Sequence, residues 1–485
     1  MKKLSAVQFF VALAISAFAQ TYTQTTLISS LSNPVAFDVA PDGRYFITQK
    51  GGVSNMAVDA QIKVFNPNGT YIGVFYDLSD SCNSDFERGL LGITVHPDFA
   101  TNQYVYAYYN HRYNGDERIR IVRFTEVNNV GTNPTIIFDL DVADNIAGNH
   151  VGGNVHLRPG DPGKIYLTIG DLAYQQGNPT LNYANKLTSP YGKILRINED
   201  GTCPTDNPFY EDGLPLNDTC DWIWSYGHRN SFDFCFSPVT DSMYCTENGW
   251  NAWDEVNMIH KGAFYGWANC EGFYANSSTS TLCNLPNDIL PIEDWGTPLP
   301  AVTGVLFYSS QVMPEFDNHL LVADNDYGRV YDITLGNAPA YDQFVSRTQW
   351  MDMTTTGGLT TIKQGTDGCV YALKGGYTSN GQLYRICPQG LNVEEQPSGI
   401  SMLSTYPNPA NTSTTVQWSL TQETAVTMQI LDITGRVVGT VFSKTEEAGS
   451  YTTAIDVQQW NLSPGQYFIQ LHTTTGVQTT KLLVH

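Results

Sequence analysis

The 485-residue sequence is poor in charge, since Asp, Glu, Lys and Arg together make up only 15% of it, and basic residues are the scarcer kind. There are 25 Lys and Arg against 47 Asp and Glu, so the formal net charge is −22. Nucleic acids and anionic membranes are bound by clustered Lys and Arg, so we expect neither as a partner. An acidic surface suits a soluble protein and the binding of divalent cations.

Long apolar runs are also lacking. After residue 19 no segment approaches the roughly 20 apolar residues that a membrane-spanning helix requires. The apolar run "LSAVQFFVALAISAFA" follows two lysines and ends in the small-residue site Ala-Phe-Ala before Gln20. This pattern predicts a signal peptide over residues 1–19 and an exported mature chain without a membrane span.

Nine cysteines are present, but no CxxC pair occurs, which argues against a zinc site. Export permits disulfides, and the last eight cysteines fall into successive couples that close short loops. The spacing allows this pairing without establishing it. The couples are Cys203/Cys220, Cys235/Cys245, Cys270/Cys283 and Cys369/Cys387, and Cys82 is left over.

No long helical heptad run is found, whereas 28 Tyr, 22 Phe, 9 Trp and 42 Gly favour β-structure. One phrase recurs: an apolar strand, a Pro/Asp/Gly turn and an aromatic strand. It is found at residues 34–52, 89–109, 152–171, 232–249 and 360–376, with a divergent sixth copy at 313–333. Repetition of one multistranded unit predicts an all-β fold, a six-bladed β-propeller over residues 20–390.

The composition changes after Cys387. Residues 391–402 are polar, contain Pro and Gly and have no sustained period, so we expect a linker. Residues 403–485 contain several short alternating strands, which predict a small C-terminal β-sandwich.

Four pieces of the C-terminal unit, in order, are "YPNPANTSTTV", "ILDITGRVV", "LSPGQYFIQL" and the terminal "TTKLLVH". Together they resemble the C-terminal sorting domain of the type IX secretion pathway of certain Gram-negative bacteria. The resemblance implies recognition of residues 403–485 by the type IX secretion machinery and transport across the outer membrane, usually with removal of the tail. The protein is therefore expected to be secreted or at the cell surface.

Four segments of the predicted propeller are "GLLGITVHPDF", "NHVGGNVHLRPGDPGKIYLTIGD", "YGKILRINEDG" and "SYGHRNSFDFCFSP…TENGWNAWDEV". They resemble the soluble glucose/sorbosone dehydrogenases, six-bladed propellers that oxidise aldoses with pyrroloquinoline quinone (PQQ) and calcium. By this resemblance His150 is the general base, Arg229 stabilises charge on the quinone oxygen, and Asn149, Asn230 and Glu87 contact the cofactor. An imidazole suits this role because its ordinary pKa is near ~6.5.

The loop "ENGWNAWDE" falls on the family's calcium segment. The resemblance implies that the carbonyls of Gly249 and Trp250 hold the cofactor-linked Ca²⁺. It places Asp254, Glu255 and the carbonyl of Tyr265 at a second, structural calcium. Oxygen ligands of this kind suit Ca²⁺, although Trp250 stands where the family usually has proline.

The sequence departs from the family where the family holds the cofactor's carboxylates with a lysine and two arginines on the last two blades. Asp326 stands at the lysine position, and only Gly, Leu and Thr stand at the arginine positions. Hydrogen bonds to charged groups contribute about 1.5–3 kcal/mol each, so PQQ binding depends on replacements. Arg329, Lys363 and Lys374 are the nearby candidates.

Two further features leave the function open. Glu87 replaces a glutamine of the sugar dehydrogenases, and "ERGLLG" and "DYGRVYDI" are similar to the Hedgehog-interacting-protein-like branch, whose propellers are not established quinoenzymes. The alternative to a PQQ-dependent sugar dehydrogenase is therefore a non-catalytic propeller that binds a glycan or a protein. A hydrolase, the third class, needs paired carboxylates or a Ser/His/Asp set in the central pocket. Asp171 and Glu247 are available acids, and Asp171 is predicted to be a turn acid.

Overall fold

The computed structural model describes most of the chain as two compact units, one ending at Gln389 and one beginning at Gly390. The described residues are 21–52, 59–113, 115–142, 148–210, 220–276, 278–353, 358–376, 380–389, 400–432, 436–474 and 476–484. The predicted signal peptide, residues 1–19, lies outside them, as does most of the predicted linker.

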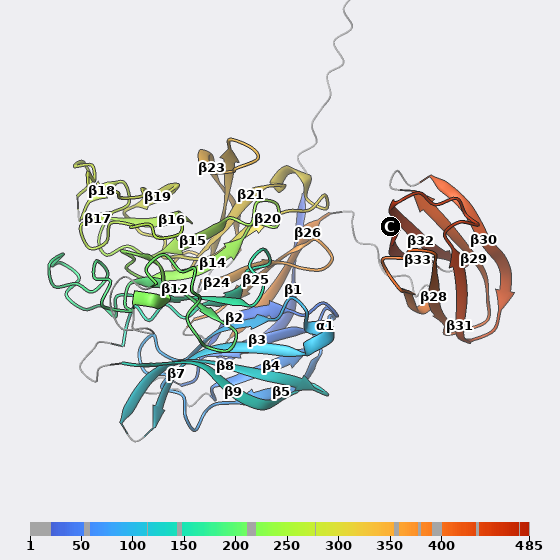
Figure 1. The fold of residues 1–485 in the computed structure, drawn as a ribbon, viewed down its shortest axis with the longest axis horizontal. Helices are drawn as coiled ribbons and strands as arrows, with labels where there is room; N and C mark the ends of the chain where they lie inside the picture. Colours follow the sequence, from blue (N-terminus) through green and yellow to red (C-terminus); the bar gives the residue numbers. More distant parts are fainter. Residues whose placement is uncertain are drawn as a thin grey trace, which may run out of the picture. The chain divides into compact units, whose positions relative to one another are not determined.

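Within the described residues, the first unit contains six four-stranded antiparallel sheets, the blades of a propeller (Figure 1). Blade 1 is β2 (Pro34–Val39), β3 (Tyr45–Gln49), β4 (Gln61–Phe65) and β5 (Tyr71–Asp77). Blade 2 is β6 (Leu90–Val95), β7 (Tyr104–Tyr113), β8 (Asp116–Val127) and β9 (Val130–Asp141). Blade 3 is β10 (Val155–Leu157), β11 (Lys164–Ile169), β12 (Lys193–Asn198) and β13 (Ile223–Tyr226).

The second half of the ring follows the same plan. Blade 4 is β14 (Ser231–Phe236), β15 (Met243–Glu247), β16 (Trp253–Ile259) and β19 (Glu293–Gly296). Blade 5 is β20 (Val302–Tyr308), β21 (His319–Asp324), β22 (Arg329–Gly336) and β23 (Gln343–Asp352). Blade 6 is β24 (Leu359–Gln364), β25 (Val370–Lys374), β26 (Gly381–Pro388) and the N-terminal strand β1 (Tyr22–Leu31).

The ring is closed by hydrogen bonds between the two ends of this unit. In Figure 1 the blue strand β1 lies beside the orange strands of blade 6, and its register runs antiparallel to β26 from Tyr22↔Pro388 to Leu31↔Gly381. The N-terminal strand β1 therefore completes the last blade as its outer strand. The sequence repeat did not reveal this closure.

Five of the six repeated phrases form the first two strands of blades 1, 2, 3, 4 and 6. The sixth, residues 313–333, was placed one strand too late, because it covers β21 and β22, the second and third strands of blade 5. Its Pro/Asp turn, which includes a short 3₁₀ helix at Pro314–Phe316, lies between β20 and β21.

The first two strands of each blade are largely buried, and in blades 1, 4 and 6 the second strand is buried along its whole length. All residues of β6 and β20 are buried. Blades 2 and 3 approach so closely that a Cβ on Gly92 would lie 2.4 Å from the carbonyl oxygen of Gly153, so only glycine fits there. Tyr108 and Ile169 belong to the apolar cluster that packs these two blades together.

Two of the predicted disulfides are confirmed, Cys270–Cys283 and Cys369–Cys387. The Cys235/Cys245 pairing was wrong. In the β14–β15 ladder Cys235 lies opposite Tyr244 and Cys245 lies opposite Phe234, so the two thiols point to opposite faces of the sheet, and both are free. Cys82 is a free thiol, whereas the Cys203/Cys220 prediction involves a side chain outside the described set.

The second unit is all-β, as predicted. It contains a three-stranded sheet of β27 (Ile400–Tyr406), β28 (Ser413–Leu420) and β31 (Gly449–Asp456), and a four-stranded sheet. The latter comprises β30 (Val437–Glu446), β29 (Thr424–Asp432), β32 (Gly465–His472) and β33 (Val477–Val484). The buried Trp418 belongs to the apolar core of this unit.

The pieces of the sorting motif are far apart in sequence but adjacent in this unit. Asn408 of "YPNPA" donates from Nδ2 to the Lys481 carbonyl (2.7 Å) and accepts from the Leu483 N–H (2.8 Å), which joins it to the terminal strand β33. Among the described residues, no helix is long and apolar enough to cross a membrane.

Candidate active site

A cavity of about 220 Å³ lies at the end of the propeller where the first strand of each blade begins and the second ends. All six blades contribute to it, so it lies on the central axis. Its wall is mainly apolar side chains, glycines, asparagine amides and threonine hydroxyls. The lining residues are Val35, Ala36, Lys50, Glu87, Leu91, Val151, Gly152, Gly153, Asn154, Asn230, Phe232, Asn248, Ala301, Thr303, Asn325, Thr360, Thr361 and Gly376.

His150 lies directly before the lining segment 151–154 and is held from both sides of its ring. Its Nδ1 is 2.7 Å from Asp171 Oδ1, and its Nε2 is 3.0 Å from Arg229 Nη2. A guanidinium can only donate, so Nε2 is the acceptor in that contact and the ring proton is on Nδ1. The imidazole therefore keeps a lone pair on Nε2.

Strand register explains why residues 21 positions apart meet. Val155 of β10 pairs with Leu167 of β11, so residues just before β10 and just after β11 come to the same end of blade 3. Gly170 allows the final approach, because a Cβ there would lie 2.1 Å from the His150 carbonyl oxygen. His150 itself has a φ of 52°, in the left-handed region that non-glycine residues adopt uncommonly.

Asp171 is completely buried and its carboxylate accepts four hydrogen bonds. Oδ1 accepts from His150 and from the Ala173 N–H (2.8 Å), and Oδ2 accepts from Asn182 Nδ2 (2.9 Å) and Trp267 Nε1 (2.8 Å). The predicted turn contact to Ala173 is present, but the sequence did not reveal that the same oxygen orients His150. The pairing of β10 with β11 is the signal that places Asp171 next to His150.

Arg229 precedes β14 and is nearly buried beside the indole of Trp267, with 5.6 Å between Cζ and the ring centroid. Its Nη1 donates to the Asn248 carbonyl (2.7 Å) and its Nη2 donates also to Gln176 Oε1 (2.9 Å). Burial lowers the pKa of Arg229, while Asp171, Glu271, Glu247 and Glu87 act in the opposite direction. Since the ordinary guanidinium pKa is above 12, the side chain stays charged at neutral pH.

The other predicted cofactor contacts also come to this end of the propeller. Glu87 lines the cavity, and its Oε2 accepts the backbone N–H of His150 at 2.6 Å. Asn230 lines the cavity and its Oδ1 accepts the Gly152 N–H at 3.3 Å. Asn149 is half-buried next to His150.

The predicted calcium loop is wrapped around one carboxylate. Oε1 of the buried Glu271 accepts the backbone N–H groups of residues 250, 251, 252 and 253, at 2.6, 2.8, 2.9 and 3.1 Å. The Gly249 N–H donates to Asp254 Oδ1 at 2.8 Å. With the N–H groups turned to these acids, the loop has a fixed conformation. The side chain of Trp250 is 37% exposed.

Glu255 is a buried carboxylate beside a second one. It pairs directly across the β15–β16 ladder with Glu247, and both carboxylates are buried. Burial, followed by the charge of Glu247, raises the pKa of Glu255 well above its ordinary value. Asn257 Nδ2 donates to Glu255 Oε2 (2.9 Å), whereas the buried Asn257 Oδ1 has no hydrogen-bond partner.

The remaining two calcium candidates, Asp254 and Tyr265, are held by other contacts. Asp254 is buried, which raises its pKa to about 6, and its Oδ2 accepts the Val302 N–H at 3.2 Å. Tyr265 stacks on His228, with 4.7 Å between ring centroids, and its hydroxyl donates to the Met258 carbonyl at 2.6 Å. These contacts fix both residues without using the Tyr265 carbonyl.

The cavity has a different cation from those suggested by the sequence. Lys50, just after β3, lines it. In the described part of the chain, none of the three candidates Arg329, Lys363 and Lys374 does so. Arg329 stacks on Tyr327, with 4.3 Å from Cζ to the ring centroid. Asn325 lines the cavity next to the exposed Asp326.

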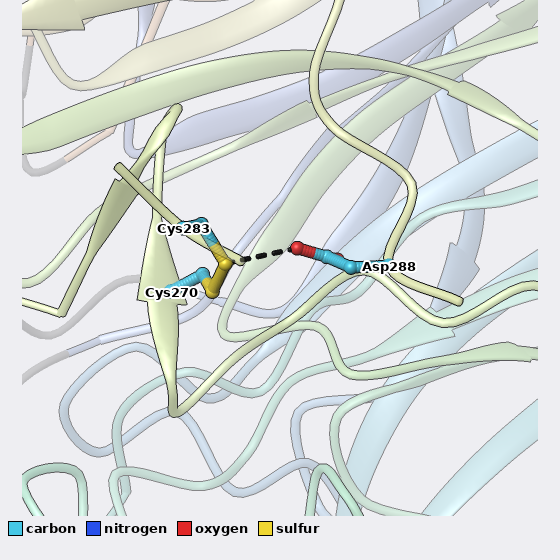
Figure 2. A group of neighbouring side chains, drawn as sticks. All are labelled: Cys270, Cys283 and Asp288. Atoms are coloured by element: carbon cyan, nitrogen blue, oxygen red, sulfur yellow. Dashed lines mark hydrogen bonds between the residues drawn. A yellow bond between two sulfur atoms is a disulfide. The ribbon is translucent and has the colours of Figure 1, made fainter. Parts of the chain in front are cut away.

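Two other clusters contain side chains of the kinds that bind metals or catalyse hydrolysis, but their chemistry does not suit either role. Figure 2 shows Cys270, Cys283 and Asp288, but the two cysteines form a disulfide and offer no thiolate to a metal. Burial raises the pKa of Asp288 to about 6, and its Oδ2 lies 3.0 Å from the Cys283 sulfur. A disulfide sulfur has no proton, so any hydrogen bond there is donated by the protonated carboxyl group.

The second cluster has the connectivity of a hydrolase triad. Ser225 Oγ is 2.9 Å from His228 Nε2, and His228 Nδ1 is 2.9 Å from Glu247 Oε2. Ser225 and His228 are both completely buried. A substrate cannot reach that hydroxyl, so the arrangement is a structural hydrogen-bond chain and gives no support to a hydrolase.

Comparison with known proteins agrees with this geometry. Residues 31–385 match the family model for glucose/sorbosone dehydrogenase, and residues 404–485 match that for a secretion system C-terminal sorting domain. Quinoprotein glucose dehydrogenase B of Acinetobacter calcoaceticus is 31% identical over 289 residues, which cover 54% of this chain and 57% of that protein. Aldose sugar dehydrogenase YliI of Escherichia coli is 26% identical over 321 residues, covering 62% and 78%.

More distant matches support the same assignment. HIPL1 protein of Arabidopsis thaliana is 24% identical over 360 residues, covering 59% of this chain and 50% of that protein. The crystal structure of the soluble aldose sugar dehydrogenase of Escherichia coli in the apo form has the same fold, with a TM-score of 0.64 at 21% identity over 76% of this chain and 100% of that one. The chain belongs to the glucose/sorbosone dehydrogenase family over residues 31–385 and has a secretion-system sorting domain at its C-terminus.

Proposed function

We propose that the protein is an exported PQQ- and calcium-dependent aldose dehydrogenase. The observation that carries this proposal is the chain Asp171–His150–Arg229 beside the axial cavity. It provides a neutral imidazole with a lone pair on Nε2, oriented by a buried carboxylate, and a guanidinium next to that lone pair. A propeller that only binds a ligand has no need of this arrangement.

The residues of the cavity fit the quinone cofactor of the family, with a different set of partners for its carboxylates. Lys50 supplies a cation and the Asn230 and Asn248 amides supply hydrogen bonds, while Arg229, behind the lining residues, supplies a fixed charge beside the cavity. When bound, PQQ supplies the acceptor for the hydride that leaves the sugar carbon. The protein supplies the proton acceptor and the fixed positive charge.

The proton chemistry follows from the hydrogen bonds. His150 Nε2 takes the proton of the substrate hydroxyl while Nδ1 continues to donate to Asp171. The resulting imidazolium is stabilised by the buried Asp171 carboxylate, much as in a Ser-His-Asp triad. Arg229 must release or share its contact with Nε2 as the substrate enters, and its other donors to Gln176 and Asn248 keep it in place.

The residues near Glu255 fit a structural calcium. The buried Glu255 carboxylate and the buried Asn257 amide oxygen without a partner are hard oxygen donors of the kind that Ca²⁺ prefers. We assign Glu255 and Asn257 as side-chain ligands, with Asp254 and the Tyr265 carbonyl nearby. Gly249 and Trp250 remain the candidates for the cofactor-linked ion.

Export is proposed from the two ends of the chain. The signal sequence over residues 1–19 directs passage across the inner membrane, and the sorting domain is recognised by the type IX machinery for release outside the cell or at its surface. A small-molecule sugar would then be oxidised outside the cytoplasm.

The test uses the full mature chain with calcium and PQQ in a dye-linked assay against a panel of aldoses. We expect turnover with at least one aldose, loss of kcat by at least about 10²-fold in His150→Ala, and normal activity in Asp161→Asn. Asp161 is a matched control because it belongs to the same blade and pairs with Arg196 away from the cavity. No turnover with any aldose in the loaded, folded protein would refute the proposal.

One observation favours a second function, a non-catalytic propeller that binds a glycan or protein. Thr360, Thr361 and Gly376 of blade 6 line the cavity where the family has basic residues. This alternative predicts that a folded, calcium-loaded protein does not bind PQQ, so a binding titration separates the two functions.

A further inference from the structure

Lys50 is a cation in a cavity that otherwise has little charge. Of the described residues that line the cavity, Lys50 and Glu87 alone have ionisable side chains, and Glu87 already accepts the His150 N–H. The lining contributed by blades 5 and 6 consists of neutral groups such as Asn325, Thr303 and Thr361. A ligand with an acidic group would therefore place that group towards blade 1.

The backbone of Lys50 is held from both sides. Its N–H donates to the Asn33 carbonyl (2.9 Å) and its carbonyl accepts the Leu90 N–H (3.1 Å), which joins blades 1 and 2. Gly89 makes room for it, since a Cβ there would lie 2.4 Å from Lys50 Cγ. The side chain is 3% exposed, and Nζ donates to the Ser84 carbonyl at 2.6 Å. This geometry gives the ammonium group a fixed position.

The charges around Lys50 do not compensate for its burial. Burial lowers its pKa to about 8, although the nearby Cys82, Asp85 and Glu87 act to raise it, while Arg88 lowers it further. A free thiol with a pKa raised by burial to about 12 contributes no charge near neutral pH. An anionic ligand beside Lys50 would favour the charged form of its amine.

We propose that Lys50 binds a carboxylate of the ligand that fills the axial cavity, and so replaces the basic residues missing from the last two blades. This inference rests on the proposed function, in which that ligand is the tricarboxylate PQQ. It places the acidic edge of the ligand against blade 1, which adjoins blade 6 in the ring, instead of against the last two blades as the family pattern implies.

The pH dependence of binding gives a test that needs no variant. If a carboxylate lies beside Lys50, its amine becomes fully protonated in the complex. At about pH 8 the complex should therefore take up about half a proton, and at about pH 6 almost none. Isothermal titration of PQQ into the calcium-loaded full mature chain, in buffers with different ionisation enthalpies, measures this uptake.

Three variants assign the effect to Lys50. Lys50→Met should weaken PQQ binding by about ten- to a hundredfold and abolish the proton uptake. Lys50→Arg should bind with little change in affinity between about pH 6 and about pH 9, because a guanidinium does not titrate there. Lys63→Met, on strand β4 of the same blade and outside the cavity lining, should behave as wild type.

The outcomes separate the two claims. If the wild type binds PQQ without proton uptake and Lys50→Met binds equally well, the role of Lys50 is refuted while the proposed function stands. If the folded, calcium-loaded wild type does not bind PQQ, the proposed function fails and this inference fails with it.

Discussion

The Asp171→Asn substitution tests the arrangement around His150 most sharply. Asp171 Oδ2 accepts from Asn182 and Trp267, so an asparagine must keep its oxygen at that position. Its amide nitrogen then takes the place of Oδ1 and donates to His150 Nδ1. The imidazole is forced into the tautomer with its proton on Nε2, where it can no longer accept the proton of a sugar hydroxyl.

The size of the effect follows from a known parallel. In the Ser-His-Asp triad the same carboxylate-to-amide change lowers kcat about 10⁴-fold, because the histidine adopts the wrong tautomer. We expect a decrease of about 10³- to 10⁴-fold here, with PQQ affinity largely retained because Asp171 does not line the cavity. The amide also faces the Ala173 N–H, so some loss of thermal stability should accompany the kinetic effect.

The assay is dye-linked aldose oxidation with the calcium- and PQQ-loaded chain, with Asp161→Asn as the matched control. Near-ultraviolet circular dichroism verifies the fold of both variants. A folded Asp171→Asn protein with kcat within about threefold of wild type would show that Asp171 does not set the tautomer of the catalytic base, and the reasoning would be wrong.

Three further predictions concern calcium, the last blade and the tail. Calcium at about one hundred times its Kd should stabilise the wild type by about 2.7 kcal/mol. Glu255→Gln should lose that increment in a thermal melt with and without chelator; an equal shift in both proteins would exclude Glu255 as a ligand. The Cys369–Cys387 disulfide joins residues 18 apart in the blade that closes the ring, so replacing both cysteines with alanine should lower the free energy of unfolding by about 3 kcal/mol in denaturant titrations. Protein collected outside the cells should lack residues 404–485 by mass spectrometry, whereas intact tails on soluble extracellular protein would contradict processing of the sorting domain.

Much of the architecture could be predicted from the sequence because each blade has its own local signal. An apolar first strand, a Pro/Asp/Gly turn and an aromatic second strand are encoded within about twenty residues, so five of the six copies were phased correctly. In blade 5 the turn between the first two strands is extended by the 3₁₀ helix Pro314–Phe316. The repeated phrase there covers the second and third strands of the blade and not the first and second. The pairing of β1 with β26 joins residues that are 350 to 366 positions apart and has no local signal.

Site residues that belong to a sequence motif could be predicted. Residues whose position depends on strand register or on packing between blades could not. His150 and Arg229 lie in motifs, and the structure brings them into contact. Lys50 was not predicted as a site residue, because a lysine that follows a strand is usually at the surface. Its position in the cavity lining results from the arrangement of the blades in a ring. The Cys235/Cys245 prediction relied on spacing, whereas the β14–β15 register decides which face each thiol occupies.

The most direct test of the central claim is a single turnover without dye. The calcium- and PQQ-loaded wild type is mixed anaerobically with an excess of aldose, and the absorbance of the bound quinone is followed in a stopped-flow instrument, in parallel with His150→Ala. We predict complete reduction of the quinone in the wild type and a rate at least about 10²-fold lower in the variant. A quinone that stays oxidised in the wild type with every aldose, or equal rates in the two proteins, would contradict the assignment of His150 as the base of a sugar dehydrogenase.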